Sequence, residues 1–382
     1  MSMLYLDNAA TTPVRREVLE AMMPFLTRWF GNPSSHHTVG EAAADALADA
    51  RARVARVLGM RAGDVVFTSG GTEANNLAVK GIAIAAQQRR GARHIVTTPI
   101  EHESILESAD YLARVHAFDV THVPVDESGC LDPAAVAGAL RDDTALLSFG
   151  YANNEVGTVQ DVAAIAAIAR ERGIPVHVDA VQAAGWLPLS AADLGVDAIS
   201  IAGHKIGAPK GTGALAVRGR VPLEPLLHGG GQERGRRSGT ENVAGAVALA
   251  TALELAEAER AEASARVCAL RDAFIARVLA TVPGAALTGD PVRRLPGTAS
   301  FTFAGTSGEA VLLELERRGV VSSSGSACAA GSDEPSHVLV AMGVAPEVAQ
   351  TAVRFTFLHD VRQPLDAVAD AVAASVAAVL AY

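Results

Sequence analysis

Cysteine and aromatic residues are scarce in this chain of 382 residues. The three cysteines are Cys130, Cys268 and Cys328, and their spacing matches neither a disulfide framework nor a zinc site. A chain without structural disulfides suits a reducing compartment, so we expect it in the cytoplasm. Aromatic residues make up 4% of the chain, whereas alanine and glycine are abundant, which favours helices packed closely on a sheet.

The sequence also lacks an excess of positive charge and any long hydrophobic run. Its formal net charge is −10, which argues against nucleic-acid binding as the main task because nucleic-acid-binding surfaces are basic. A basic stretch, QERGRR at residues 232–237, is too short to form such a surface. No apolar run approaches the ~20 residues of a membrane-spanning helix, and the N-terminal residues do not resemble a signal peptide. We therefore expect neither a nucleic-acid nor a membrane partner.

Short apolar runs alternate with helix-like stretches over residues 40–260, which predicts an α/β fold. Continuous apolar strands separated by helices indicate a mainly parallel sheet that is covered on both faces. A long helical stretch at residues 243–281 leads to a smaller α+β part with strands at 299–305, 319–325 and 353–357. We expect a large domain over 15–260 and a small domain made of 1–14 and 261–382. The first strand of the large sheet is expected within 64–71, where a glycine turn follows it, and the others at 94–98, 121–125, 145–152, 175–180, 197–202 and 213–217.

Several polar residues follow these expected strands directly, where open α/β sheets bind their ligands. Gly71 and Thr72 precede a helix, so they form either a phosphate-binding turn or an ordinary glycine turn with a threonine cap. Asp179 ends one apolar strand, and His204 and Lys205 end the next. Because a buried charge is costly, a lysine at the end of a buried strand is either a surface loop residue or a residue whose amine takes part in chemistry.

This combination of groups favours one cofactor, pyridoxal 5′-phosphate. A lysine can form a Schiff base with the aldehyde, an acid can hold the proton of the pyridine ring, and a helix start can bind the phosphate. Nucleotide-binding motifs fit less well. The chain has no Gly-Lys-Ser/Thr triplet, and an apolar run follows GTGALA at residues 211–216, where a dinucleotide fingerprint requires a helix.

The chain resembles the cysteine desulfurases, which are fold-type I pyridoxal-phosphate enzymes of the class V aminotransferase superfamily. The resemblance runs nearly end to end, and the SSGSAC segment is similar to that of group I members. It implies a large pyridoxal-phosphate-dependent transferase domain. The motifs that carry it include YLDNAATTP (5–13), FTSGGTEANNLAVKG (67–81), EHESIL (101–106), HVDAVQAAG (177–185), GHKIGAPKGTGAL (203–215), GGGQERGRRSGTEN (229–242), SSGSAC (323–328) and VRFTF (353–357).

The resemblance implies a role for each matching residue around the cofactor ring. Lys205 would hold the cofactor as a Schiff base and move the α-proton of the substrate. Asp179 would pair with the ring nitrogen, and Gln182 would donate to the ring hydroxyl oxygen. His102 would stack on the ring and help to transfer protons.

The resemblance also implies phosphate, substrate and sulfur sites. Gly71, Thr72, His204 and Thr240 of the partner subunit would bind the phosphate, so a homodimer is expected. Asn154 would contact the cofactor and, with Arg354, hold the substrate carboxylate, for which the planar guanidinium is suited. Cys328 would be the nucleophile. No metal is expected.

The implied reaction converts L-cysteine to L-alanine and leaves the sulfur as a persulfide on Cys328 for an acceptor protein, such as an iron–sulfur scaffold. Three residues depart from the family pattern. Ala202 stands where a phosphate-binding serine is usual, Ala208 where an aromatic residue or glycine is common, and Leu358 where a glycine is usual. Alternatives are a selenocysteine lyase, another enzyme of the superfamily, or a non-catalytic sulfur-assembly scaffold that has lost the cofactor.

Overall fold

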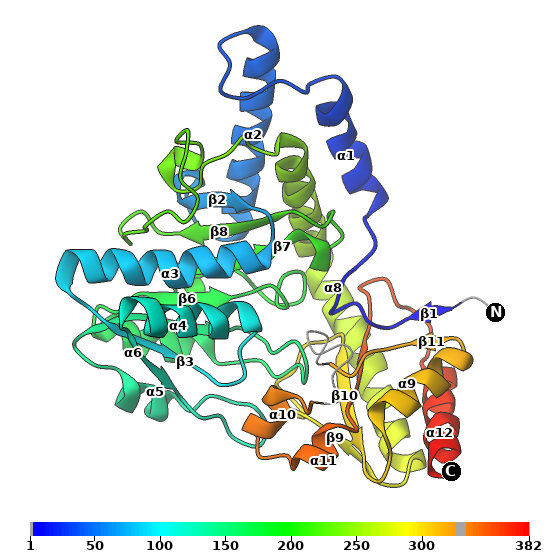
Figure 1. The fold of residues 1–382 in the computed structure, drawn as a ribbon. Coiled ribbons are helices and arrows are strands. Elements are labelled where there is room, and N and C mark those ends of the chain that lie inside the picture. The colour runs from blue at the N-terminus through cyan, green and yellow to red at the C-terminus, as the bar shows by residue number, and fades with distance from the viewer. Residues whose placement is uncertain (1–2, 326–333, 382) are drawn as a thin grey trace.

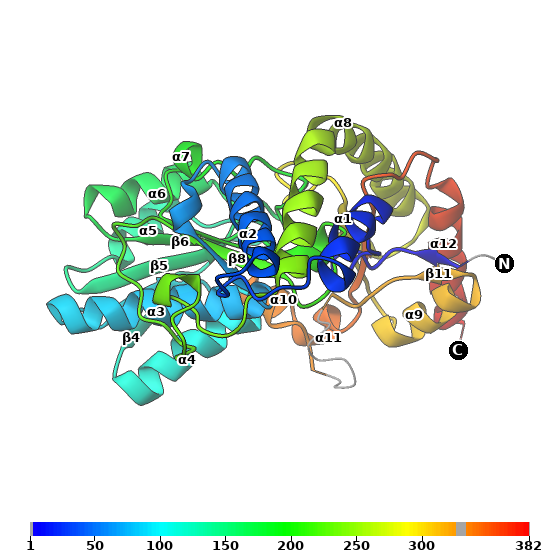
Figure 2. The ribbon, with the colours of Figure 1, turned by 90° about the horizontal axis from the view of Figure 1, so that it is seen from above.

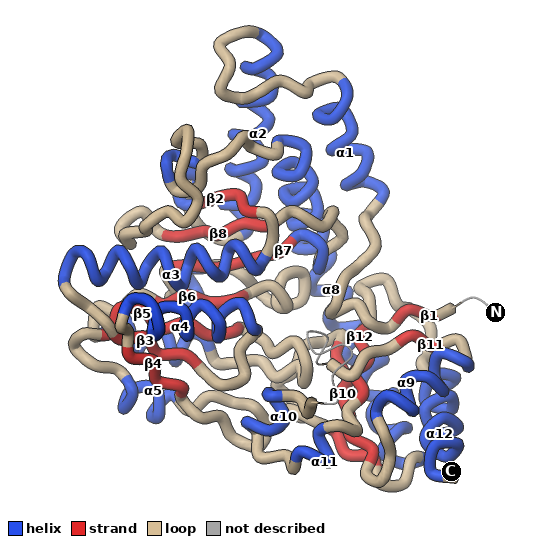
Figure 3. Tube along the Cα trace, viewed as in Figure 1, coloured by secondary structure: helices blue, strands red, loops and turns tan. Residues whose placement is uncertain are grey.

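A seven-stranded sheet forms the centre of the larger part of the computed structural model, which describes residues 3–325 and 334–381. The strand order is β2-β8-β7-β6-β5-β3-β4, and Figure 3 shows the strands as one stack. β8 runs antiparallel to its neighbours β2 and β7, and the other pairs are parallel. The strands are β2 (Val65–Thr68), β3 (His94–Thr97), β4 (Asp119–His122), β5 (Thr144–Gly150), β6 (Val176–Asp179), β7 (Ala198–Ala202) and β8 (Gly213–Val217). This confirms the predicted α/β fold with a mainly parallel sheet.

Helices cover both faces of this sheet because its strands are apolar on both sides. In β8, Ala214 and Ala216 belong to the hydrophobic core on the first face of the sheet, and Leu215 and Val217 belong to the core on the second face. This is expected because side chains along a strand alternate between faces. α3 (Gly71–Arg90) and α4 (Glu103–His116) cover the second face (Figure 1). The first core is covered by α2 (Thr38–Val57), α5 (Pro133–Ala139), α6 (Val162–Glu171), α7 (Ala191–Leu194) and the start of α8 (Val243–Thr281), and α1 (Arg16–Thr27) packs on α8.

The long helix α8 joins this part to the smaller one, as Figure 2 shows from above. Its first half packs into the core of the large sheet, with Leu249 and Leu253 fully or nearly fully buried. Its second half places Val267, Phe274 and Val278 in a separate core. The predicted helix over 243–281 is therefore confirmed, while the domain bounds 15–260 and 261–382 stay a prediction.

The smaller part consists of two short sheets and the C-terminal helices. β10 (Thr298–Phe303) pairs antiparallel with β12 (Val353–Thr356) and β9 (Ala285–Leu287). β1 (Leu4–Tyr5) pairs with β11 (Val320–Val321), so the N-terminal segment belongs to this part. The strand expected over 319–325 is thus much shorter. The helices here are α9 (Gly308–Arg317), α10 (His337–Ala341), α11 (Pro346–Ala349) and α12 (Asp366–Leu380).

Four chain segments that leave strands come together at one edge of the large sheet. Thr68 and Ala202, the last residues of β2 and β7, both pair with Gly213 at the start of β8. Asp179 ends β6 beside Gly150, and the turn after β3 lies at the same edge because β3 is parallel to β5. A side chain on Gly213 would lie 2.6 Å from the backbone of the turn after β2. A glycine is therefore required for this turn to approach. Among the described residues, no helix is both long and apolar enough to cross a membrane.

Phe274 is the centre of the smaller core and offers a test of how this part is held together. Its ring lies 5.3–5.9 Å from those of Phe301, Phe355 and Phe357, each in an edge-to-face arrangement. We expect Phe274→Ala to lower the free energy of unfolding by about 3–5 kcal/mol, because it removes a buried ring and leaves a cavity. Chemical denaturation checks this. The exposed Val292→Ala serves as the control, and an equal effect of both variants would contradict the prediction.

Candidate active site

A cavity of about 460 Å³ lies at the edge where these strands end. Its walls bring together residues from both parts of the chain. Nine residues predicted from the sequence line it: Gly71, Thr72, His102, Asn154, Asp179, Gln182, His204, Lys205 and Arg354. Their individual roles stay predictions, but their convergence from separate segments makes this cavity the candidate active site.

The N-terminus of α3 forms one end of the cavity and suits a phosphate group. The backbone N–H groups of its first turn and the helix dipole favour an anion there. Gly71 has no room for a side chain, since a Cβ would lie 2.8 Å from Val181 Cγ2. Ala202 also lines this end, so the methyl group that replaces the usual serine faces the predicted phosphate site.

His204 also lines the cavity. Burial, with the charges of Lys205 and Lys210, lowers the pKa of its imidazole to about 4, so the ring is neutral near pH 7. The ring Nδ1 lies 3.2 Å from the hydroxyl of Thr11. A neutral imidazole carries one N–H donor, which suits hydrogen bonding to an anion.

Asp179 is held in place by two donors. The N–H group of Val181 donates to Oδ1 at 2.9 Å, and the side-chain amide of Asn75 donates to Oδ2 at 2.6 Å. Both donors fix the orientation of the carboxylate. A carboxylate in this position suits a cationic ring nitrogen.

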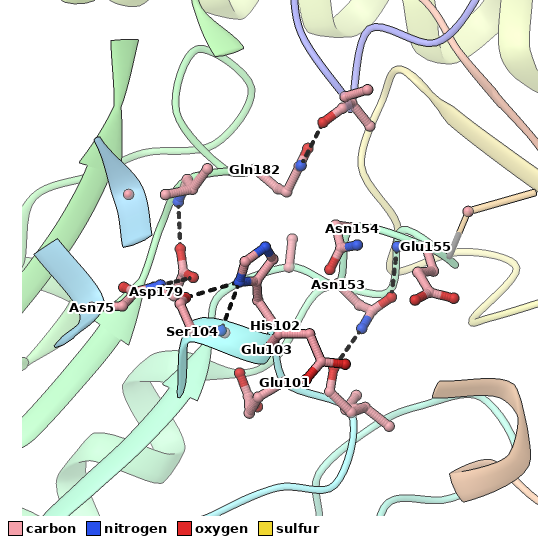
Figure 4. Close-up of a pocket in the computed structure, with 18 of the residues that line it drawn as sticks. Asn75, Glu101, His102, Glu103, Ser104, Asn153, Asn154, Glu155, Asp179 and Gln182 are labelled. Atoms are coloured by element: carbon pink, nitrogen blue, oxygen red, sulfur yellow. Dashed lines mark hydrogen bonds between the residues drawn. The ribbon is translucent and has the colours of Figure 1, made fainter. Parts of the chain in front are cut away.

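His102 caps the N-terminus of α4 with its ring. Nδ1 accepts a hydrogen bond from the N–H group of Ser104 at 3.0 Å and lies 2.8 Å from the Ser104 hydroxyl. The other ring nitrogen points away from Ser104, into the cavity (Figure 4). Local hydrogen bonds therefore fix how this imidazole faces the site.

Lys205 ends a short 3₁₀ turn after β7, and its amine reaches the N-terminal segment. Nζ donates to the carbonyl oxygens of Ala9 and Ala10, the latter at 2.8 Å. Gln182 also donates to the Ala9 carbonyl, at 3.0 Å. The N-terminal segment thus forms a wall of the site, which explains why the motif YLDNAATTP accompanies the lysine motif.

Arg354 comes from β12 in the smaller part and is 2% exposed. One terminal nitrogen pairs with Asp7 at 2.7 Å, and the other donates to the carbonyl oxygen of Asn154 at 2.7 Å. Its Nε is buried and has no hydrogen-bond partner among the described residues. The predicted carboxylate-binding fork is therefore partly engaged by Asp7, which sequence reasoning did not predict.

Sequence reasoning also missed Glu101, Asn75 and Ser104. Glu101 is 5% exposed and lines the cavity. Burial raises the pKa of its carboxyl to about 8, the hydrogen bond from Thr98 opposes this, and the charge of Asp179 adds to it. The place of Glu101, directly before His102 at a strand end, was a signal that could have identified it. Asn75 and Ser104 gave no signal beyond their position in the matching motifs.

Of the other two predicted residues, one is described and does not line the cavity. Thr240 is exposed and lines a separate cavity of about 190 Å³, together with Arg237. Cys328 lies outside the described residues.

Cys130 is a poor candidate for the nucleophile. It is buried, and burial with nearby carboxylates raises the pKa of its thiol to about 11, so little of it is thiolate. No group of three metal-binding side chains occurs within residues 3–325 and 334–381.

Comparisons with known proteins agree with this geometry. The family model described as aminotransferase class V matches residues 4–364. The chain belongs to the aminotransferase class V family. It is 46% identical to an IscS-like cysteine desulfurase of Mycobacterium tuberculosis, with 99% of this chain and 98% of the relative covered. It is 44% identical to the cysteine desulfurase IscS of Dictyoglomus turgidum, over 95% of this chain and 92% of that one.

Solved structures of the family share the fold. A NifS-like protein superposes with a TM-score of 0.89 at 37% identity, covering 99% of each chain. A structure titled SspA in complex with cysteine has a TM-score of 0.81 at 35% identity, covering 92% of this chain and 98% of that one. These relatives confirm the predicted family and its fold.

Glu101 gives a test based on pH. The pKa of Glu101 is about 8 in the folded protein and 4.5 in its ordinary state, so the folded protein binds this proton more tightly than the unfolded chain does. The resulting stability is fully present below pH 4.5 and is lost as the pH rises toward 8. We expect the melting temperature of the wild type, relative to Glu101→Gln, to fall over this range. Thermal unfolding of the cofactor-free protein measures it. Glu107→Gln, on an exposed position of α4, should track the wild type. A constant difference between wild type and Glu101→Gln would refute the assignment.

Proposed function

We propose that this enzyme is a pyridoxal-phosphate-dependent cysteine desulfurase, which converts L-cysteine to L-alanine and holds the sulfur as a persulfide on Cys328. The observation that carries the proposal is the meeting of Lys205, Asp179 and the N-terminus of α3 in one cavity. The cysteine desulfurase relatives, at 44–46% identity over nearly the whole chain, support the activity.

The side chains in the cavity fit this cofactor. Gly71, Thr72 and His204 would hold the phosphate, and Asp179 would keep the proton on the ring nitrogen. Gln182 would donate to the ring hydroxyl oxygen, and Lys205 would bind the cofactor covalently. When bound, the cofactor supplies an electron sink for the bond that breaks next to the substrate amine.

Lys205 moves the α-proton of the substrate in this proposal. Its neutral amine accepts the proton at Nζ and becomes an ammonium group. The carbonyl oxygens of Ala9 and Ala10, which Nζ already contacts, accept hydrogen bonds from that ammonium group and stabilise it. The N-terminal segment therefore assists the lysine directly.

Arg354 and Asn154 orient the substrate through its carboxylate. Arg354 is held rigid by Asp7 and the Asn154 carbonyl, so little side-chain freedom is lost on binding. Two donors remain: the second N–H of the terminal nitrogen that pairs with Asp7 and the buried Nε, which has no partner among the described residues. Leaving such a group unpaired costs about 1–3 kcal/mol, which a bound carboxylate would recover.

Cys328 accepts the sulfur. Its thiolate attacks the sulfur of the substrate and forms an S–S bond, while the bond between that sulfur and the β-carbon breaks. The electron pair of the broken bond stays with the carbon fragment, which gains protons and leaves as alanine. The segment around Cys328 is rich in serine, alanine and glycine, which suits a loop that presents a thiolate to both substrate and acceptor.

We further propose that the enzyme works as a homodimer in the cytoplasm. Thr240 is exposed and lies outside the cavity of its own chain, in agreement with a phosphate site completed by Thr240 of the partner subunit. The acceptor would be a protein of iron–sulfur cluster assembly or of a thiolation pathway.

Incubation with L-cysteine tests the reaction and the nucleophile together. We expect the cofactor-loaded wild type to produce alanine and a persulfide on Cys328, detected by mass spectrometry of its peptides. Cys328→Ser should lose the persulfide and most alanine formation, roughly 10²-fold or more as for other nucleophile losses. Lys205→Ala serves as the inactive control. A persulfide on Cys130 or Cys268, or equal turnover in Cys328→Ser, would disprove the role.

Ala202 offers a gain-of-function test of the phosphate site. We expect Ala202→Ser to bind pyridoxal phosphate more tightly, because the added hydroxyl would donate to a charged group, a bond worth about 1.5–3 kcal/mol. Equilibrium dialysis of cofactor-free protein would show a dissociation constant lowered roughly tenfold or more. Ala208→Ser, at a buried position that does not line the cavity, is the control. Unchanged affinity in Ala202→Ser would place the phosphate elsewhere.

A further inference from the structure

A chain of hydrogen bonds connects Asp179 to His102 through two residues that have no assigned role. The amide of Asn75 donates to Asp179 Oδ2 at 2.6 Å and to the Ser104 hydroxyl at 2.9 Å. The Ser104 hydroxyl lies 2.8 Å from His102 Nδ1. Figure 4 shows these groups side by side, and all four residues line the cavity. Asn75 is 1% exposed and Ser104 is 6% exposed, so water does not replace these bonds.

The charge of Asp179 sets the direction of the first bond. A carboxylate only accepts hydrogen bonds, so it must face the NH₂ group of Asn75 and not its oxygen. The Asn75 oxygen is consequently buried without a partner among the described residues. That arrangement is costly, and it persists because both amide hydrogens are used, one on Asp179 and one on Ser104.

The direction of the remaining bonds follows. Since the Ser104 oxygen accepts from Asn75, its own hydrogen is available for His102 Nδ1. The backbone N–H group of Ser104 donates to the same nitrogen at 3.0 Å. A hydrogen on Nδ1 would point at both of these donors. The ring therefore carries its hydrogen on Nε2, the nitrogen that faces the cavity.

We propose that Asn75 and Ser104 are positioning residues, which transmit the orientation of the Asp179 carboxylate to His102 and hold its imidazole as the Nε2–H tautomer. His102 then presents a hydrogen-bond donor to the cavity and does not accept a proton at Nδ1. This inference rests on the proposed function for its catalytic meaning, because it makes His102 a donor toward the reacting groups.

Nitrogen NMR of protein labelled with ¹⁵N-histidine tests the tautomer without measuring activity. Spectra of His102→Gln identify the signals of this residue among the 11 histidines. We expect the cofactor-loaded and cofactor-free wild type to show a protonated Nε2 and an unprotonated Nδ1. A protonated Nδ1, or an average of both tautomers, would overturn the proposal.

Two variants test the relay itself. Asn75→Leu removes both amide bonds, and Ser104→Ala removes the hydroxyl while the backbone cap of α4 remains. We expect each to shift the Nδ1 signal and to raise the population of the Nδ1–H tautomer roughly threefold to tenfold, as the loss of one net hydrogen bond implies. Ser104→Ala keeps the test valid if Asn75→Leu does not fold. Signals of His102 identical to wild type in the folded variants would exclude a role for the relay.

A matched control comes from another buried histidine. The ring of His177 lies between the hydroxyls of Ser148 and Ser200, at 2.8 Å from each. Ser148→Ala should change the NMR signals of His177. It should leave the signals of His102 and the turnover unchanged.

Asn75→Leu should lower kcat roughly tenfold or more, with a smaller effect on KM. If the wild type has the Nε2–H tautomer but produces no alanine, the proposed function fails and the positioning role stands. If alanine forms with the opposite tautomer, only the relay is refuted.

Discussion

The shared edge of strands β2, β3, β6 and β7 is the constraint on which the site depends. Each strand ends in a segment that carries one chemical function, and the sheet places these ends next to one another because the four strands run in the same direction. The glycine at the start of β8 lets the turn after β2 approach closely enough to complete this edge. A helix N-terminus, a carboxylate, an imidazole and an amine then face one cavity.

The smaller part of the chain closes this cavity from the other side. Asp7 and Arg354 are 347 residues apart in sequence, yet they form a largely buried ion pair. Breaking such a pair is expected to be costly because it leaves a buried charge without its partner. The N-terminal segment that carries Asp7 also provides the carbonyl oxygens for Lys205. The lysine and the arginine are therefore positioned by the same short stretch of backbone.

Polar side chains behind the cavity set the properties of those that face it. Asp179 accepts two hydrogen bonds, whereas burial raises the pKa of Glu101, a neighbouring carboxyl, to about 8. Two acids in one cavity thus have different surroundings, which is a common way for active sites to separate the roles of similar groups.

The sequence by itself was sufficient for the seven strands of the large sheet, the long helix over 243–281 and nine of the residues that line the cavity. These features arise from local periodicity and from short motifs, which are readable without a fold. The tertiary structure decided which side chains contact one another: that Asp7 engages Arg354, that Asn75 and Ser104 join Asp179 to His102, and that Glu101 is buried. Hydrogen-bond direction and burial depend on atoms brought together from distant segments, so no local pattern in the chain could determine them.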